Sequence, residues 1–204
     1  MSIDQRRTQL IEAAIVLAER NGVAAVTTRD VAREAGVSLG VVHYCFDSKD
    51  AMMTEVVKAL SIQLRDSADE AATLEAPGAT GPDALRQLVR LALAAMWHDV
   101  ESTRDRQLLT YETTTYALRE GAHDPGKIRI ARDQYAFNDA TLADLLEKMR
   151  DVTGTQWRIP LPTLSRLMLS LIDGLVLRWL VDEDNAAARD QLDHIADLVA
   201  GLTD

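Results

Sequence analysis

Apolar residues recur every three or four positions along most of the chain, which is the spacing of helices with one buried face. The pattern predicts a first helix over residues 3–21, and the Asn21-Gly22 pair after it is typical of a helix end. Ser48 can cap a later helix that runs to about Leu74, and residues 75–82, rich in Gly and Pro, predict a loop. Further helices are predicted over residues 83–97, 102–120 and 127–152, followed by a last pair between Leu164 and Leu202.

Two short helical patterns with a tight break between them lie in residues 27–45. Thr27 can cap the first pattern, and Asp30 is placed to reach back to that cap. Gly36 follows the first pattern, where a chain leaving a helix often needs a left-handed residue, and Ser38 can cap the second. Two short helices joined by a Gly-containing turn form a helix-turn-helix unit.

The second short pattern has an inward and an outward side. Its inward side is apolar or small, with Val41, Val42 and Cys45. Its outward positions, which can face a DNA groove, are Ser38, Leu39, Gly40, His43 and Tyr44. The alternative is an ordinary helical hairpin, but that arrangement needs apolar residues on most of its second helix. No Asp or Glu occurs between Glu34 and Asp47, as expected of a surface that approaches phosphates.

Residues 5–53 resemble the N-terminal DNA-binding domain of the TetR family of bacterial transcription regulators. The matching features are Asn21-Gly22, Thr27-Thr28, Asp30-Val31-Ala32, Ala35-Gly36-Val37-Ser38, and Phe46 followed by Ser48-Lys49. The match covers about a quarter of the chain, and the remainder resembles the family in length and helical layout. The resemblance implies an all-α fold of about nine helices. Residues 1–50 are expected to form a three-helix DNA-binding domain, and residues 51–204 an effector-binding and dimerisation domain.

The resemblance also implies DNA contacts at matching positions. Thr28 and Lys49 are expected to contact phosphate, and the outward residues of the second helix are expected to face the groove. His43 stands where the family usually has tyrosine, and Leu39 where a longer polar residue is frequent. The first departure weakens the expected phosphate contact, and both leave the operator sequence open, although Leu39 can meet a thymine methyl group.

The charge of the chain is unevenly distributed. The net charge is −10, yet residues 1–50 carry six Lys or Arg against seven Asp or Glu, whereas residues 51–204 carry sixteen against twenty-five. Near-neutrality at the N-terminus permits DNA binding if the cations there share one face, with modest and salt-sensitive affinity. The five cations considered for that face are Arg6, Arg7, Arg29, Arg33 and Lys49.

Composition fits a globular helical protein, with 47% hydrophobic, 26% charged and only 4% aromatic residues. No apolar run approaches the length of a membrane span, and the first residues lack an apolar signal core. A single cysteine cannot form an internal disulfide, so we expect a cytoplasmic protein without membrane contact. Cys45 is read as a small core residue, and a redox role for it stays open.

Catalytic motifs are missing from the sequence, so no enzymatic activity, metal or cofactor is expected. Glu120 and His123 have the spacing of half a di-iron motif, but Gly121 lies between them and no second copy occurs. The alternative function is an all-α ligand-binding or enzymatic protein with a vestigial helix-turn-helix.

Polar and aromatic side chains interrupt the apolar pattern of the middle helices, as in a pocket between helices. The residues expected to line such an effector pocket are Trp97, Tyr111, Thr115, Tyr135 and Asn138. The alternative is that Trp97 and Tyr111 are core residues and that the threonines are exposed. TetR-like regulators bind an inducer in this part of the chain, but its identity cannot be read from the sequence.

The last two helices are apolar on more than one side, and Gly174 permits a close helix approach. They predict a symmetric four-helix dimer interface, as in TetR-like proteins, and the alternative is burial within one subunit. The expected interface residues are Leu164, Leu167, Leu171, Leu175, Trp179, Leu192, Ile195 and Val199. The resulting hypothesis is a homodimeric repressor that binds a palindromic operator and is released when an effector tilts the helix from Ser48 to Leu74.

Overall fold

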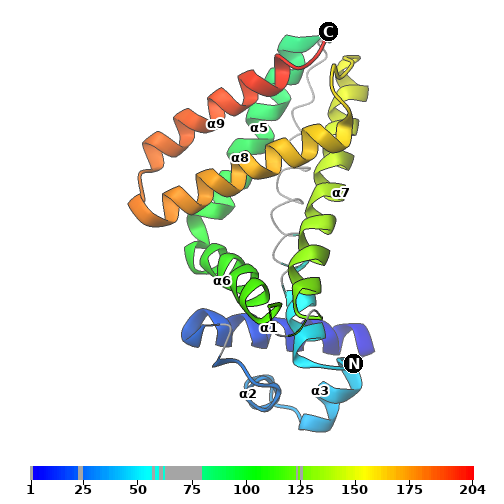
Figure 1. Ribbon diagram of the computed structural model, residues 1–204, viewed down its shortest axis with the longest axis vertical. Coiled ribbons are helices and arrows are strands. Elements are labelled where there is room, and N and C mark those ends of the chain that lie inside the picture. Colours follow the sequence, from blue (N-terminus) through cyan, green and yellow to red (C-terminus); the bar gives the residue numbers. More distant parts are fainter. Residues whose placement is uncertain are drawn as a thin grey trace. The chain divides into compact units, whose positions relative to one another are not determined.

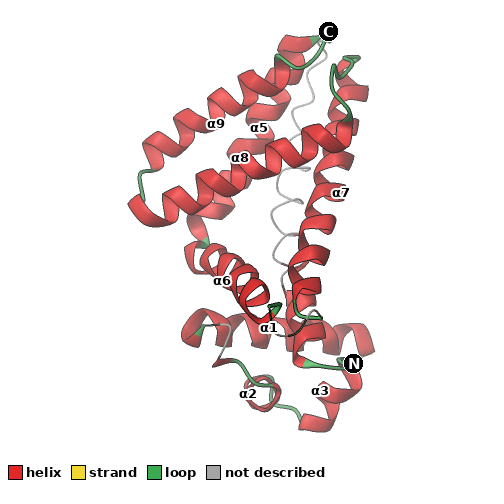
Figure 2. Ribbon diagram, in the orientation of Figure 1, coloured by secondary structure: helices red, strands yellow, loops and turns green. Residues whose placement is uncertain are grey.

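The computed structural model describes residues 2–22, 25–56, 58–59, 62, 80–122, 124 and 126–204, and within these ranges it contains helices and loops but no β-strand (Figure 2). Eight α-helices are labelled in Figure 1. Residues 49–56 and 58–59 are also helical and are termed here the fourth helical segment. The predicted all-α fold is therefore confirmed.

The chain forms two compact units. The first comprises Met1–Ser61 and Asp105–Ala136, and the second comprises Ile62–Arg104 and Phe137–Asp204. Helix α6 (Arg104–Glu120) and the first turns of α7 (Ile128–Thr153) thus group with the N-terminal helices. The predicted domain boundary at residue 50 stays a prediction.

In the first unit, α2 (Thr28–Glu34) and α3 (Leu39–Cys45) pack against each other and against α1 (Ile3–Asn21) (Figure 1). Their buried side chains form one apolar core, which Leu109 of α6 also enters. The core includes Leu10, Ala14, Val31, Val42, Phe46, Met52 and Val56. Burial of such side chains is the main stabilising contribution to a unit of this size.

In the second unit, α5 (Pro82–Ser102) and α9 (Asn185–Ala200) lie side by side, and α8 (Leu161–Asp182) also packs against α9 (Figure 1). Trp97 of α5 meets Trp179 of α8 in an edge-to-face pair with ring centroids 5.4 Å apart. Ion pairs join α5 to α9 along their length, namely Arg86–Asp197, Arg90–Asp193 and Glu101–Arg189.

Predicted and observed helix limits agree best near the N-terminus, where residues 3–21 form α1 as expected. Helix α5 extends past the predicted end at residue 97, because Val100 continues its buried stripe beyond the polar residues His98 and Asp99. The far part of the helix predicted to reach Leu74 lies outside the described residues. So do most of the predicted loop, residues 75–79, and His123.

Across the described part of the chain, no helix is both long enough and apolar enough to cross a membrane.

Cys45 tests the packing beneath α3, because its side chain is buried with 4% exposed and no disulfide partner exists in the sequence. We expect the native thiol to react with a disulfide reagent on the order of 100-fold more slowly than the unfolded chain. As a matched control, Tyr44→Cys in a Cys45→Ala background moves the thiol to an exposed position one residue away and should react at once. Rapid stoichiometric labelling of native Cys45 would contradict the burial.

Candidate nucleic-acid interface

Local hydrogen bonds predicted from the sequence stabilise the start of α2 and the turn between α2 and α3. The Asp30 backbone N–H donates to Thr27 Oγ1 at 3.2 Å, and the Thr27 hydroxyl donates to Asp30 Oδ2 at 2.6 Å. Gly36 is left-handed with φ +65, and the Val37 N–H donates to the Ala32 carbonyl at 2.9 Å, which ends α2. Ser38 occupies the predicted cap position of α3, but within the described residues its side chain makes no capping hydrogen bond.

Two polar side chains of α1 hold the C-terminal ends of α2 and α3. Gln9 Nε2 donates to the Ala35 carbonyl at 2.9 Å, and an Arg7 guanidinium nitrogen donates to the Cys45 carbonyl at 2.6 Å. The Arg7 guanidinium also lies 4.7 Å from the centroid of the Phe46 ring. Terminal helix carbonyls lack intrahelical partners, so both bonds satisfy groups that would otherwise need water. Arg7 is therefore directed at the end of α3.

The outward face of α3 is exposed as the sequence predicted. Val42 and Cys45 are buried, whereas Gly40, His43 and Tyr44 are exposed, Tyr44 to 77%. Ser38 is exposed and Leu39 is half-buried. A large aromatic side chain this exposed covers no core of its own subunit, and its hydroxyl and ring face outward.

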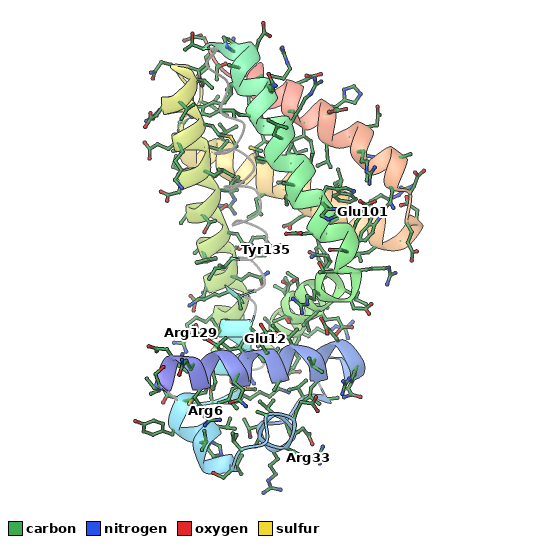
Figure 3. All side chains as sticks on the ribbon, turned by 180° about the vertical axis from the view of Figure 1, so that it is seen from behind. Arg6, Glu12, Arg33, Glu101, Arg129 and Tyr135 are labelled. Carbon is green, nitrogen blue, oxygen red and sulfur yellow. The ribbon has the colours of Figure 1, made fainter. Side chains whose placement is uncertain are left out.

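Two arginines of α2 add positive charge beside α3. Arg29 is exposed, and neighbouring Thr28 is half-buried. Arg33 projects from α2 away from the other helices of its unit (Figure 3) and pairs with Asp30 at 2.6 Å. The positive charge that α2 adds beside α3 is therefore small, and Asp30 neutralises part of it. This agrees with the near-neutral sequence of residues 1–50.

Lys49, at the start of the fourth helical segment, lies in a cluster with Tyr116 of α6 and Lys127. The ammonium groups of Lys49 and Lys127 are 5.9 Å and 5.6 Å from the centroid of the Tyr116 ring. Lys127 Nζ donates to Tyr116 Oη at 3.3 Å and is 2.8 Å from Asp50 Oδ2. Burial lowers the pKa of Lys49, whereas the hydrogen bond to Asp50 raises the pKa of Lys127. Sequence reasoning missed Tyr116 and Lys127, because they are distant from Lys49 along the chain.

The five residues predicted to line an effector pocket are divided between the two units. Trp97 and Asn138 belong to the second unit, and Tyr111, Thr115 and Tyr135 belong to the first. Of these residues, Figure 3 labels Tyr135. Trp97 is buried, Tyr111 and Asn138 are half-buried, and Thr115 and Tyr135 are exposed. Their convergence on one pocket stays a prediction.

Orphan polar atoms occur near this predicted set. Among the described residues, buried Asn138 Oδ1, Asp139 Oδ1 and Trp97 Nε1 have no hydrogen-bond partner. Buried polar atoms normally find a partner, so each of these marks a place where a ligand or water can bind. Asp139 was not among the residues predicted to line the pocket.

Most of the predicted dimer residues are covered by their own subunit. Six of the eight are buried within the chain, namely Leu164, Leu175, Trp179, Leu192, Ile195 and Val199. Leu167 is exposed and Leu171 is half-buried. A helix that is apolar all round has two faces with the same period, and most of the residues predicted for the interface lie on the inner face. The exposed face of α8 carries a different stripe, comprising Leu167, Ser170, Gly174, Leu177 and Val181.

The N-terminal part of this chain matches a known protein family. Residues 10–56 match the family model for bacterial regulatory proteins of the tetR family. The HTH-type nicotine-responsive transcriptional repressor HdnoR of Paenarthrobacter nicotinovorans is 26% identical over 197 residues, 97% of this chain and 95% of that protein. The HTH-type transcriptional regulator BetI of Agrobacterium fabrum is 40% identical over 73 residues, 36% of this chain and 35% of that protein.

The fold is also shared with solved structures. The fatty acid degradation regulator FadR from Bacillus halodurans superposes with a TM-score of 0.69 at 13% identity, covering 96% of this chain and 95% of that one. At this identity the similarity establishes the fold alone. Together with the family model and the relative that matches nearly end to end, it agrees with the helix-turn-helix described above. Residues 10–56 thus match the DNA-binding part of the tetR family, and the chain is a DNA-binding transcriptional regulator similar to TetR-type repressors.

Proposed function

We propose that this regulator is a repressor that places α3 in the major groove of its operator. The observation that carries the proposal is the exposed face of α3, with Gly40 allowing close approach and His43 and Tyr44 offering hydrogen-bonding groups. Thr28, Arg29 and Lys49 flank this face and are the proposed phosphate contacts, and Ser38 and Leu39 begin it. A DNA-binding regulator acts where the chromosome is, so we place it in the cytoplasm. An enzyme with a vestigial helix-turn-helix is not favoured, because the relatives are regulators.

The DNA contacts are tested on duplexes that the wild-type protein selects from a random pool. We expect Tyr44→Ala to lower affinity by about tenfold, the usual cost of one or two lost contacts, without lowering the melting temperature. Lys49→Met should lower affinity similarly and reduce the slope of log affinity against log salt by about 1. Lys148→Met removes the same charge from α7 and serves as the matched control. If the variants at Tyr44 and Lys49 bind DNA as tightly as the wild-type protein, the exposed face of α3 is not the DNA-binding surface.

We further propose that the protein is a homodimer joined through the outward stripe of α8. Its residues Leu167, Ser170, Gly174, Leu177 and Val181 are spaced by three and four positions, which is the seam of two packed helices. A Cβ added at Gly174 would meet no described atom within 4 Å, so the described residues of its own subunit do not require a glycine there. A glycine in mid-helix costs about 1 kcal/mol relative to alanine, and close approach of a partner helix accounts for it.

A two-fold dimer presents two copies of α3 to DNA. The operator is then palindromic, with half-site centres separated by about one helical turn or a multiple of it. Exposed leucine and valine side chains on α8 would otherwise form an apolar patch facing water. The proposed interface thus accounts for an apolar stripe that serves no packing purpose inside the described subunit.

The interface is tested by light scattering, which should give twice the chain mass of 22.5 kDa for the wild-type protein. Leu177→Glu should yield monomers, because a charge in a helix seam is buried without a partner. Leu118→Glu on α6 is the matched control, since Leu118 is 56% exposed and Leu177 is 51% exposed. Gly174→Leu should also weaken the dimer while leaving the subunit folded. Dimers that persist in both α8 variants would place the interface elsewhere.

We propose that a small-molecule effector binds in the second unit at Asn138 and Asp139 and opposes DNA binding. Both residues bury an oxygen that has no hydrogen-bond partner among the described residues. A ligand with N–H groups would satisfy two acceptors, and a protonated amine would also match the charge of Asp139. Trp97 of the same unit is a proposed part of the lining, and Tyr111, Thr115 and Tyr135 of the first unit stay predicted effector contacts. The similar HdnoR is a nicotine-responsive repressor, which supports an amine as the first class to test.

The effector site is tested by adding small amines, nicotine included, and their neutral isosteres to the protein bound to its selected duplex. Any amine that releases DNA from the wild-type protein should need an on the order of tenfold higher concentration with Asp139→Asn, because one charge-assisted hydrogen bond is weakened. Asp144→Asn, an exposed position on the same helix, is the matched control. Equal responses of the two variants, or release by neutral isosteres alone, would refute an amine site at Asp139.

A further inference from the structure

An acidic residue lies directly beside the proposed phosphate contact. Asp50 follows Lys49 in the sequence, and its carboxylate borders a groove of about 440 Å³ in the first unit. The same groove is lined by Asp47, Asp124 and Asp133. A carboxylate next to a DNA-binding lysine has two unfavourable effects. It repels the approaching phosphates, and it attracts the lysine ammonium away from them.

Lys127, which is distant along the chain, neutralises the charge of the Asp50 carboxylate. Its ammonium is 2.8 Å from Asp50 Oδ2 and 3.1 Å from Asp50 Oδ1, so both oxygens face the same cation. The Tyr116 hydroxyl accepts a hydrogen bond from Lys127 Nζ at 3.3 Å, which fixes the ammonium from the side of α6. The Lys49 ammonium lies over the same ring, at 5.9 Å from its centroid. Asp50 is thus paired with Lys127, which directly precedes α7, and its charge also acts on the neighbouring Lys49 ammonium.

We propose that Lys127 is a positioning residue for DNA binding, which neutralises Asp50 and thereby keeps the Lys49 ammonium directed to the operator phosphate. The inference rests on the proposed phosphate contact of Lys49. Lys127 itself need not touch DNA. Its effect is electrostatic and passes through Asp50, so it should disappear when Asp50 carries no charge.

The test measures the affinity of full-length variants for the duplex selected by the wild-type protein, as a function of salt concentration. Lys127→Met should lower affinity about fivefold, with the loss largest at low salt, because an uncompensated carboxylate then lies beside the phosphate contact. Adding Asp50→Asn to Lys127→Met should return the affinity to within about twofold of wild type. This double variant also lacks the ion pair, so the recovery cannot come from restored folding.

Lys58→Met is the matched control, because Lys58 pairs with Glu55 at 3.2 Å in the same helical segment and the substitution changes the net charge equally. It should alter affinity less than about twofold. Equal losses in Lys58→Met and Lys127→Met would reduce the effect to net charge and overturn the proposal. A double variant that binds DNA as weakly as Lys127→Met would also overturn the proposal, because the Asp50–Lys127 ion pair would then act by stabilising the fold.

Lys49→Met, measured beside these variants, separates this inference from the function on which it rests. If Lys49→Met binds DNA weakly and Lys127→Met binds it normally, the proposed phosphate contact of Lys49 is supported and the proposed role of Lys127 is refuted. Normal binding by Lys49→Met refutes the phosphate contact itself, and the role of Lys127 falls with it. Weak binding by both single variants, together with recovery by Asp50→Asn, supports the proposal.

Discussion

The apolar core under α3 is the constraint on which the rest of the first unit depends. A helix of seven residues is not stable alone in water, so α3 exists because Val42 and Cys45 are buried against α1 and α2. Burial stabilises the helix but is not directional. The bonds from Gln9 and Arg7 to the ends of α2 and α3 are directional, and they set the angle of each helix on α1. The exposed face of α3 is therefore fixed by what its other face buries.

Local charge, and not total charge, reconciles an acidic chain with DNA binding. Charges in water are screened beyond about 8 Å at physiological salt, so the acidic residues of distant helices contribute little at α3. Three carboxylates close to the reading helices each face a cation: Asp30 with Arg33, Glu34 with Arg20, and Asp50 with Lys127. Neutralisation of these nearby carboxylates therefore favours the approach of DNA phosphates as much as additional cations would.

The sequence predicted the parts of the structure that depend on local chemistry. Caps, turns and helix periods are set by neighbouring residues, so Thr27, Gly36 and the limits of α1 were placed correctly. The sequence did not show which side of α8 its own subunit covers, because Leu164 and Leu167 belong to stripes with the same period and similar hydropathy. Nor could it show the pairing of Asp50 with Lys127, since that contact joins segments 77 residues apart and leaves no periodic signal.

The assignment of α6 to the first unit changes which residues can act on the DNA-reading helices. Leu109 of α6 enters the core that supports α3, and Arg106 of α6 pairs with Glu19 of α1 at 3.0 Å. A shift of α6 along its axis would therefore disturb the packing of α1 directly, with no need for movement of the fourth helical segment. Tyr111 and Thr115, proposed as effector contacts, lie on this same helix, within two turns of Leu109. Because a packed core tolerates little displacement, a ligand that moved these two residues would also move the support of α3.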